Sequence, residues 1–177
     1  MSKAKEIAHT LIEEGIKARA HFQVWWALRN KALPKYYDAM NDFAYVDFFH
    51  AANSGHYTLF WLSLAKIFDH DSRVAGIKEF CRALRAEGMN KSALAICHAL
   101  KPHQGIVKKV MAIRNKSVVR NEHGITRSEV YELNGVTPNQ IRDLIDVTCK
   151  SINEAASGLG INNLIFDSDR AERATLN

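Results

Sequence analysis

The chain has 177 residues, 47% of them hydrophobic, and 24 Lys and Arg against 19 Asp and Glu, a formal net charge of +5. This length and composition exclude a disordered or fibrous chain and predict one globular domain whose core needs no disulfide or metal. The three cysteines lack C-x-x-C spacing, so we expect buried or free thiols in a reducing cytoplasm. No stretch resembles a signal peptide or approaches the ~20 apolar residues of a membrane span.

Apolar residues at three- and four-residue spacings predict two long helices in the first part of the chain. The first extends from Ser2 to about Leu33 and is ended by Pro34. Gly15 lowers its helix propensity, which makes a kink or break there an alternative. The second long helix extends from about Ala39 to Phe68, with its apolar residues on a single stripe.

Shorter helices separated by polar turns are predicted next. The polar sequence at residues 69–72 can supply the N-cap of a third helix that ends at Gly88. A fourth segment begins at residues 90–92, and Pro102 interrupts it before the apolar pattern resumes. We expect this resumed helix to end near residues 119–120.

The last part of the chain contains one clear helix start. After a predicted loop at residues 124–135, Thr137-Pro138 combines a capping residue with proline at the first helical position, and the helix ends at Gly158. Strand-like alternation never exceeds a few residues. The sequence therefore predicts an all-α bundle of four to five helices over residues 1–160, followed by a polar tail, residues 161–177.

The positive charge of the chain is concentrated in residues 101–127. This segment holds seven Lys and Arg side chains and one acidic residue, Glu122, a local net charge of +6, so the remainder carries −1. A local positive field attracts anionic ligands and supplies the salt-sensitive part of nucleic-acid affinity. A solvated basic helix face is the alternative interpretation.

Arg114 occupies an unusual position in this segment. It follows Val107, Val110 and Met111 on the stripe that faces the bundle, so its side chain is not placed for free solvation. A buried arginine needs a partner. That partner is a carboxylate such as Asp69 or Asp47, a carbonyl, an interface or a ligand phosphate.

Arg114 also begins an Arg-Asn-Lys sequence at the end of a predicted helix. Together with the aromatic-rich second helix and its Leu-Ala-Lys-Ile-Phe-Asp ending at residues 64–69, this resembles the HEPN superfamily, and within it the AbiU2-like branch tied to abortive phage infection. The resemblance extends from about Val24 to Ala155. It implies a homodimer of toxin-like function. Ribonucleolytic members use an arginine, a polar residue and a histidine in a cleft between two protomers, and they cut RNA without a metal.

The resemblance assigns roles residue by residue. Arg114 matches the family's arginine and Asn115 its polar residue, but position 120, where the usual motif has histidine, is Arg120 in this chain. The next histidine, His123, is the candidate replacement and completes the predicted catalytic set with Arg114 and Asn115. The residues that we expect to contact RNA are Lys108, Lys109, Lys116 and Arg120.

The missing histidine determines whether cleavage can be expected. Metal-free cleavage needs one group to take a proton from the 2′-hydroxyl and another to protonate the leaving oxygen. Histidine titrates near neutrality, whereas Arg120 stays protonated and can hold a phosphate but is a poor base. His123 lies nine residues after Arg114 and so on the opposite face of a continuous helix. Either the helix ends before Asn121 and His123 takes over the role, or the site binds RNA without cutting it.

The other histidines and acids have simpler explanations. His56 lies on the apolar stripe and is best interpreted as a satisfied core or interface histidine. Asp69, His70 and Asp71 fit a helix end and a cap better than a cation site. With no zinc signature, Gly-rich phosphate loop or G-x-S-x-G motif, we predict no metal and no cofactor.

Three functional hypotheses remain. The first is an RNA-binding domain of a toxin or phage-defence type, with metal-independent endoribonuclease activity as an added capacity. The second is an inactive binding or regulatory module that pairs with a nucleotidyltransferase-type antitoxin, and the third is a purely structural helical dimer. Adjacent aromatic residues such as Phe48 and Phe49 point to two sides of a helix, so one of them can face a second protomer.

Overall fold

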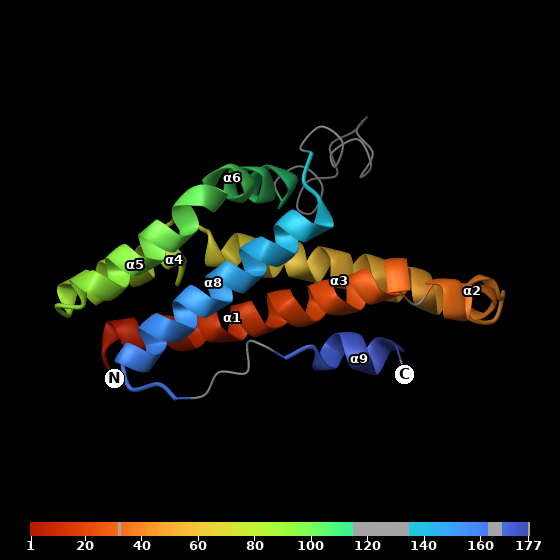
Figure 1. Cartoon of the computed structure of the whole chain (residues 1–177), viewed down its shortest axis with the longest axis horizontal. Helices are drawn as coiled ribbons and strands as arrows, with labels where there is room; N and C mark the ends of the chain where they lie inside the picture. The colour runs from red at the N-terminus through yellow and green to blue at the C-terminus, as the bar shows by residue number, and fades with distance from the viewer. Residues whose placement is uncertain (32, 115–134, 163–167, 177) are drawn as a thin grey trace.

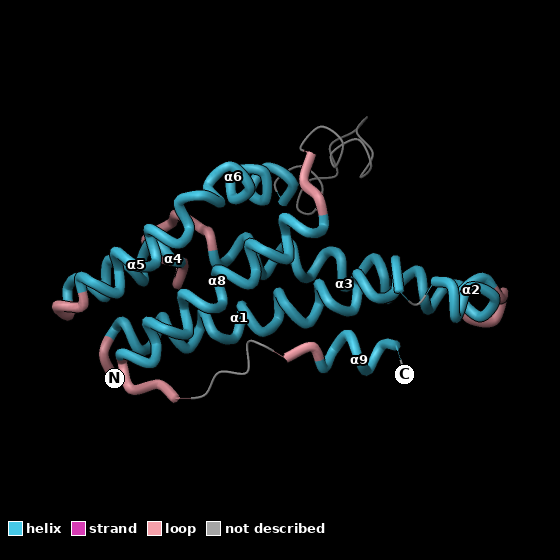
Figure 2. Tube along the Cα trace, viewed as in Figure 1, coloured by secondary structure: helices cyan, strands magenta, loops and turns pink. Residues whose placement is uncertain are grey.

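The computed structural model describes residues 1–31, 33–114, 135–162 and 168–176. Every regular element within these ranges is helical, which confirms the predicted all-α bundle. Figures 1 and 2 show its long helices, with α1 (Lys3–Trp26) in contact with both α3 (Val46–Ile67) and α8 (Pro138–Gly158). None of the described helices is long and apolar enough to cross a membrane.

Aromatic rings fill the space between α1 and α3. The ring centroids of Trp25 and Phe60 are 5.3 Å apart, and those of Phe22 and Phe60 are 5.6 Å apart. Phe60 and Trp61 are fully buried, and Tyr57 packs against both. Truncating a buried aromatic side chain to alanine costs roughly 3–5 kcal/mol, so this cluster is a main source of the stability of the bundle.

The first helix is continuous through Gly15, where the sequence suggested a kink or break. Ser2 caps its start by accepting a hydrogen bond from the backbone N–H of Lys5 at 3.4 Å. The irregularity lies later, in the π-helical turn η1 (Ala27–Lys31). A further helix, α2 (Leu33–Asn41), then contains Pro34 in its first turn, where proline is tolerated because its missing N–H has no helical acceptor.

The prediction of one helix from Ala39 to Phe68 is wrong at its start. Asp42 separates α2 from α3, because its side chain accepts the N–H of Ala44 at 2.7 Å and its carbonyl accepts the N–H of Val46 at 2.9 Å. Such a turn around aspartate competes with helix continuation. As a result Phe43, expected on the buried stripe, is 97% exposed.

Helix α4 (Ile77–Ala86) begins later than the predicted cap at residues 69–72. Its N-cap is Gly76, which approaches the backbone so closely that an added Cβ would lie 2.6 Å from the Asp69 carbonyl oxygen. Only glycine fits this approach, so residue 76 rather than the polar turn sets where α4 starts.

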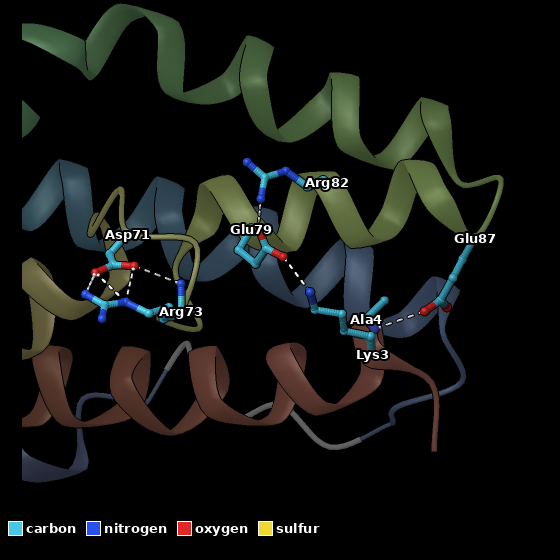
Figure 3. Close-up of polar contacts among 7 residues, drawn as sticks. All are labelled: Lys3, Ala4, Asp71, Arg73, Glu79, Arg82 and Glu87. Carbon is cyan, nitrogen blue, oxygen red and sulfur yellow. Dashed lines mark hydrogen bonds and ion pairs between the residues drawn. The ribbon is translucent and has the colours of Figure 1, made fainter.

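Polar contacts hold α4 against the first turn of α1 (Figure 3). Lys3 donates to the carboxylate of Glu79 at 2.6 Å, and Arg82 donates to the same carboxylate. The hydrogen bond from Lys3 is the main reason why the pKa of Glu79 is lowered. Glu87 accepts the backbone N–H of Ala4 at 3.0 Å, which satisfies one of the donors at the start of α1.

The fourth predicted segment begins and is interrupted as expected. It consists of α5 (Asn90–Leu100), the 3-10 turn η2 (Lys101–His103) that contains Pro102, and α6 (Gln104–Ile113). The predicted end of α6 near residues 119–120 and most of the predicted loop that follows it lie outside the described residues.

The polar tail contains one more helix, α9 (Arg170–Leu176), which lies along α1. Gln23 donates to the carbonyl of Ser168 at 2.9 Å, and the hydroxyl of Tyr36 donates to the carbonyl of Leu176 at 3.2 Å. These contacts join the last described residues to the end of α1 and the start of α2.

We expect Thr137→Ala to destabilise the fold by about 1 kcal/mol. Thr137 and Gln140 form a capping box at the start of α8: the Thr137 hydroxyl accepts the backbone N–H of Gln140 at 3.3 Å, and the Gln140 side chain accepts the backbone N–H of Thr137 at 3.0 Å. The substitution removes the first of these bonds, because alanine has no hydroxyl. Urea unfolding measures the change. Thr10→Ala, which removes an exposed mid-helix hydroxyl, is the control and should change stability by only a few tenths of that amount; equal effects would contradict the capping role.

Candidate functional site

Arg114 lies at the C-terminal end of α6, where it is the C-cap residue. Val110 and Ile113 in the preceding turn are fully buried, and α6 contacts both α3 and α8. Arg114 itself is half-buried, and its Nε atom is shielded from solvent. The predicted orientation toward the bundle is therefore correct. A positive charge at this end of a helix is favourable because the last carbonyl groups carry partial negative charge.

Two of the predicted RNA contacts lie on the same helix and differ in their surroundings. Lys108 is exposed, with its ammonium group available to a ligand from solution. Lys109 is half-buried, and its Nζ atom donates to the carbonyl oxygen of Gly135 at 3.3 Å. Lys109 thus connects α6 to the residue that leads into α8. Lys101, in η2, adds a further exposed cation to this side of the bundle.

The structure places only part of the predicted site. Arg114, Lys108 and Lys109 are brought together by α6, whereas Asn115, Lys116, Arg120 and His123 lie outside the described residues. The described part of the candidate site consists of Lys108, Lys109 and Arg114. Within that part, one arginine and two lysines share a single helix, and α6 contains no acidic residue.

A histidine pair joins α1 and α3 and was only half anticipated. The Nδ1 atoms of His21 and His56 are 2.9 Å apart, so one ring donates and the other accepts. His56 was interpreted from the sequence as a satisfied histidine, and its partner is now identified. His21 precedes Phe22 and lies four residues before Trp25, a spacing that placed it at the edge of the buried stripe and could have revealed it.

The histidine pair favours the neutral form of both rings. Burial lowers the pKa of His21, the neighbouring His56 lowers it further, and burial also lowers the pKa of His56. Glu14 acts on His21 in the opposite direction. The pair stabilises the α1–α3 contact when a single proton lies between the two Nδ1 atoms, so that one ring donates and the other accepts.

Glu14 is a buried acid on the same face of α1. Its carboxylate accepts hydrogen bonds from Lys17 at 3.1 Å and from Lys66 of α3 at 3.2 Å. Burial raises its pKa, but hydrogen bonds from Lys17, Lys66 and Ser63 outweigh burial, and the pKa is lowered. Glu14 is therefore a charged tie between α1 and α3. Across the described ranges, His, Cys, Asp and Glu form no group of three or more that could hold a metal.

Exposed aromatic side chains gather at the junction of α2 and α3, which is the right-hand end of the molecule in Figure 1. We call this surface the aromatic tip and define it as Tyr37, Phe43, Tyr45 and Phe48. These four side chains are 57%, 97%, 55% and 68% exposed. Clustered exposed apolar residues of this size are typical of interaction surfaces, whereas scattered ones are ordinary.

Comparison with known proteins gives one match. The family model HEPN_AbiU2, described as AbiU2, matches residues 1–173, which is nearly the whole chain. Neither a curated protein nor a solved structure gives a significant match.

We expect the free energy of unfolding to fall as the pH drops below about 6.5, because the unfolded chain protonates histidines that the folded chain keeps neutral. Stability stops falling once the pH is below the lowered pKa values of His21 and His56 in the folded chain, where both states are protonated. His56→Asn should flatten this pH dependence between about pH 7 and about pH 5. Urea unfolding across that range checks it.

The matched control for the histidine pair is His50→Asn, on the exposed side of the same helix. This variant should keep the pH dependence of the wild-type chain. A flattened profile in His50→Asn, or an unchanged profile in His56→Asn, would contradict the role of the pair.

Proposed function

The chain belongs to the AbiU2 family of HEPN domains, and from this membership we propose that it binds RNA through α6 and Arg114 as part of an abortive-infection or toxin system. The observation that carries the proposal is the position of Arg114 at the end of a helix whose other charged residues, Lys108 and Lys109, are also cationic. Arginine recognises phosphate through several parallel donors, and lysine adds point charge.

The setting of Arg114 suits a phosphate ligand better than a solvated charge. Val110 and Ile113 fix the end of α6 in the core, and the Nε atom of Arg114 is shielded from solvent, so part of this side chain is positioned before any ligand arrives. Holding a side chain in its bound arrangement reduces the entropy lost on binding. Lys108 remains in solvent, where it contributes to the salt-dependent attraction of a polyanion.

We propose cleavage as a second property of the same site. In this proposal Arg114 and Asn115 hold the scissile phosphate, and His123 transfers the proton that Arg120 cannot. No metal takes part in this chemistry. If His123 cannot reach the phosphate, the domain is a binding or regulatory module, for which a nucleotidyltransferase-type antitoxin is the proposed partner.

We also propose that the protein is a homodimer in which the aromatic tip lies at the interface. Helix α3 carries Phe48 near its start and Leu59 beyond its middle in exposed positions, and within the described part of the chain its fully buried residues begin only at Phe60. A second protomer that covers this face would remove the apolar surface from water.

RNA binding is tested by charge removal at Lys108. We expect Lys108→Ala to weaken binding to all RNA sequences alike and to reduce the slope of log affinity against log salt by about 0.7, the contribution of one phosphate contact on a single strand. Fluorescence anisotropy over a salt series measures this slope. Lys91→Ala, which removes an exposed lysine from α5, is the matched control and should leave it unchanged.

Variants of Arg114 distinguish a specific phosphate contact from general electrostatic attraction to RNA. Arg114→Lys keeps the charge but loses the parallel donors, so its RNA affinity should lie between those of the wild-type chain and Arg114→Ala. Unfolding curves for both variants show whether the fold is retained. Equal binding by all three chains would contradict a phosphate contact at Arg114.

Cleavage is assayed on labelled RNA in the presence of EDTA. If the protein is a nuclease, both Arg114→Ala and His123→Ala abolish cutting, with a loss of about a hundred-fold or more for His123 as the proton carrier. Cutting that survives either change rules out these roles. A protein that binds RNA without cutting it is a binding or regulatory module. A protein that neither binds nor cuts RNA is a structural dimer only.

The homodimer is tested with a charge placed on the aromatic tip. Phe48→Asp should shift the protein from dimer to monomer in sedimentation velocity, because the interface would have to bury an unpaired carboxylate. Leu94→Asp is the matched control, since Leu94 is 61% exposed on α5, away from the tip. A dimer that withstands Phe48→Asp, or a wild-type chain that is monomeric, would refute the proposed interface.

A further inference from the structure

Two cysteines face each other across the α4–α5 hairpin. Cys81 belongs to α4 and Cys97 to α5, and only residues 87–89 separate the two helices. The hairpin is closed by a hydrogen bond from the backbone N–H of Met89 to the carbonyl of Leu84 at 2.8 Å. Antiparallel helices joined by so short a turn keep a fixed register.

Two contacts of the sulfur atoms define this register. The Sγ atom of Cys81 donates to the carbonyl of Ala93 at 3.9 Å, and the guanidinium of Arg85 donates to the Sγ atom of Cys97 at 3.7 Å. Arg85 lies one turn after Cys81, and Cys97 lies one turn after Ala93. The two thiols are therefore side by side, and they share a hydrogen bond.

The two thiols differ in their surroundings. Cys97 is exposed, and the guanidinium of Arg85 donates a hydrogen bond to its sulfur. Accessible cysteines beside a cationic side chain are typical of reactive sites. Cys81 is buried, and burial followed by the charge and hydrogen bond of Cys97 raises the pKa of its thiol to about 12. Accessible cysteines next to a second cysteine are typical of reversible oxidation sites.

We propose that Cys81 and Cys97 are a peroxide-responsive pair that forms a reversible disulfide within one chain, with Cys97 as the reacting thiol and Cys81 as the resolving thiol. This site is separate from α6 and does not depend on RNA binding. Its oxidant is hydrogen peroxide or another peroxide, and its reductant is a dithiol.

The oxidation proceeds in two balanced steps. The Cys97 thiolate attacks one peroxide oxygen, the O–O bond breaks, and the released hydroxide takes a proton to become water, which leaves sulfenic acid on Cys97. The sulfur of Cys81 then attacks the sulfur of Cys97, so the S–S bond forms and the S–O bond breaks. The thiol proton of Cys81 leaves with the hydroxide as a second water. Cys97 carries no negative charge once it is a sulfenic acid. Its charge then no longer raises the pKa of the Cys81 thiol, and burial is the main cause that remains.

The disulfide would tie α5 to a helix that is already fixed. Lys3 and Ala4 of α1 hold Glu79 and Glu87, which lie on α4 and at its end (Figure 3). Helix α5 leads through η2 into α6, so the oxidised hairpin would connect the first turn of α1 to the segment that carries Arg114.

The experiment uses the full chain, treated with hydrogen peroxide, alkylated and mapped by mass spectrometry. We expect the protein to lose two hydrogen atoms in mass, to show one peptide pair joining Cys81 to Cys97, and to keep Cys149 as a free thiol. Dithiothreitol should reverse the change. Unchanged thiols, overoxidised Cys97, or a disulfide between two Cys97 residues of different chains would overturn the proposal.

Variants identify the role of each thiol. Cys81→Ser should leave Cys97 as a sulfenic acid that dimedone traps, and Cys97→Ser should abolish the reaction. Cys149→Ser is the matched control, since Cys149 is buried on α8 and donates to the carbonyl of Gly15 at 3.7 Å, and it should still form the disulfide. Arg85→Gln should slow oxidation of Cys97 several-fold; an unchanged rate would remove Arg85 from the mechanism.

Discussion

Helix α1 packs along α3 through a continuous set of aromatic rings, and the other helices take their positions from this pair. Phe22 and Trp25 meet Phe60 of the facing helix at centroid distances of 5.6 and 5.3 Å. Hydrogen bonds accompany this packing: Glu14 accepts from Lys17 and Lys66, and His21 is hydrogen-bonded to His56. Aromatic packing supplies the free energy, and the hydrogen bonds permit only one alignment of the two helices.

The packing of α1 against α3 also leaves an apolar surface and a basic surface on different parts of the molecule. Helix α3 is longer than the part of it that the described helices bury fully, so its first turn and the aromatic tip remain exposed. Helix α6 instead buries Val110 and Ile113 and exposes Lys108. Apolar and basic surfaces therefore lie on different helices, as expected if one surface meets protein and the other meets an anion.

The sequence predicts the fold well wherever periodic apolar residues coincide with a local stop or start signal. Thr137-Pro138 starts α8 as expected, and Pro102 interrupts the chain between α5 and α6. The start of α3 was missed because Phe43 continues the apolar stripe, while Asp42 ends the helix through a turn that periodicity does not register. Gly76 was missed as a cap because its role depends on the distant backbone of Asp69.

The candidate site was predictable to a smaller degree, since it depends on how helices meet. Arg114 was recognised from its place on the apolar stripe, and the structure shows it half-buried at the end of α6. The bond from Lys109 to Gly135 and the pairing of His21 with His56 join residues far apart in the sequence, so local spacing could place His21 near the core but could not identify its partner. The hairpin that aligns Cys81 with Cys97 likewise depends on a tertiary register.

The π-helical turn at Ala27–Lys31 changes the rotation of the chain about the helix axis directly after α1. A π turn corresponds to one residue inserted into an α-helix, and each residue of an α-helix advances the chain by about 100°. Side chains within this turn are therefore rotated relative to those of a continuous α-helix. Loss of one residue from this turn would rotate the residues that follow it by about 100° about the helix axis, while the aromatic residues before it kept their contact with α3.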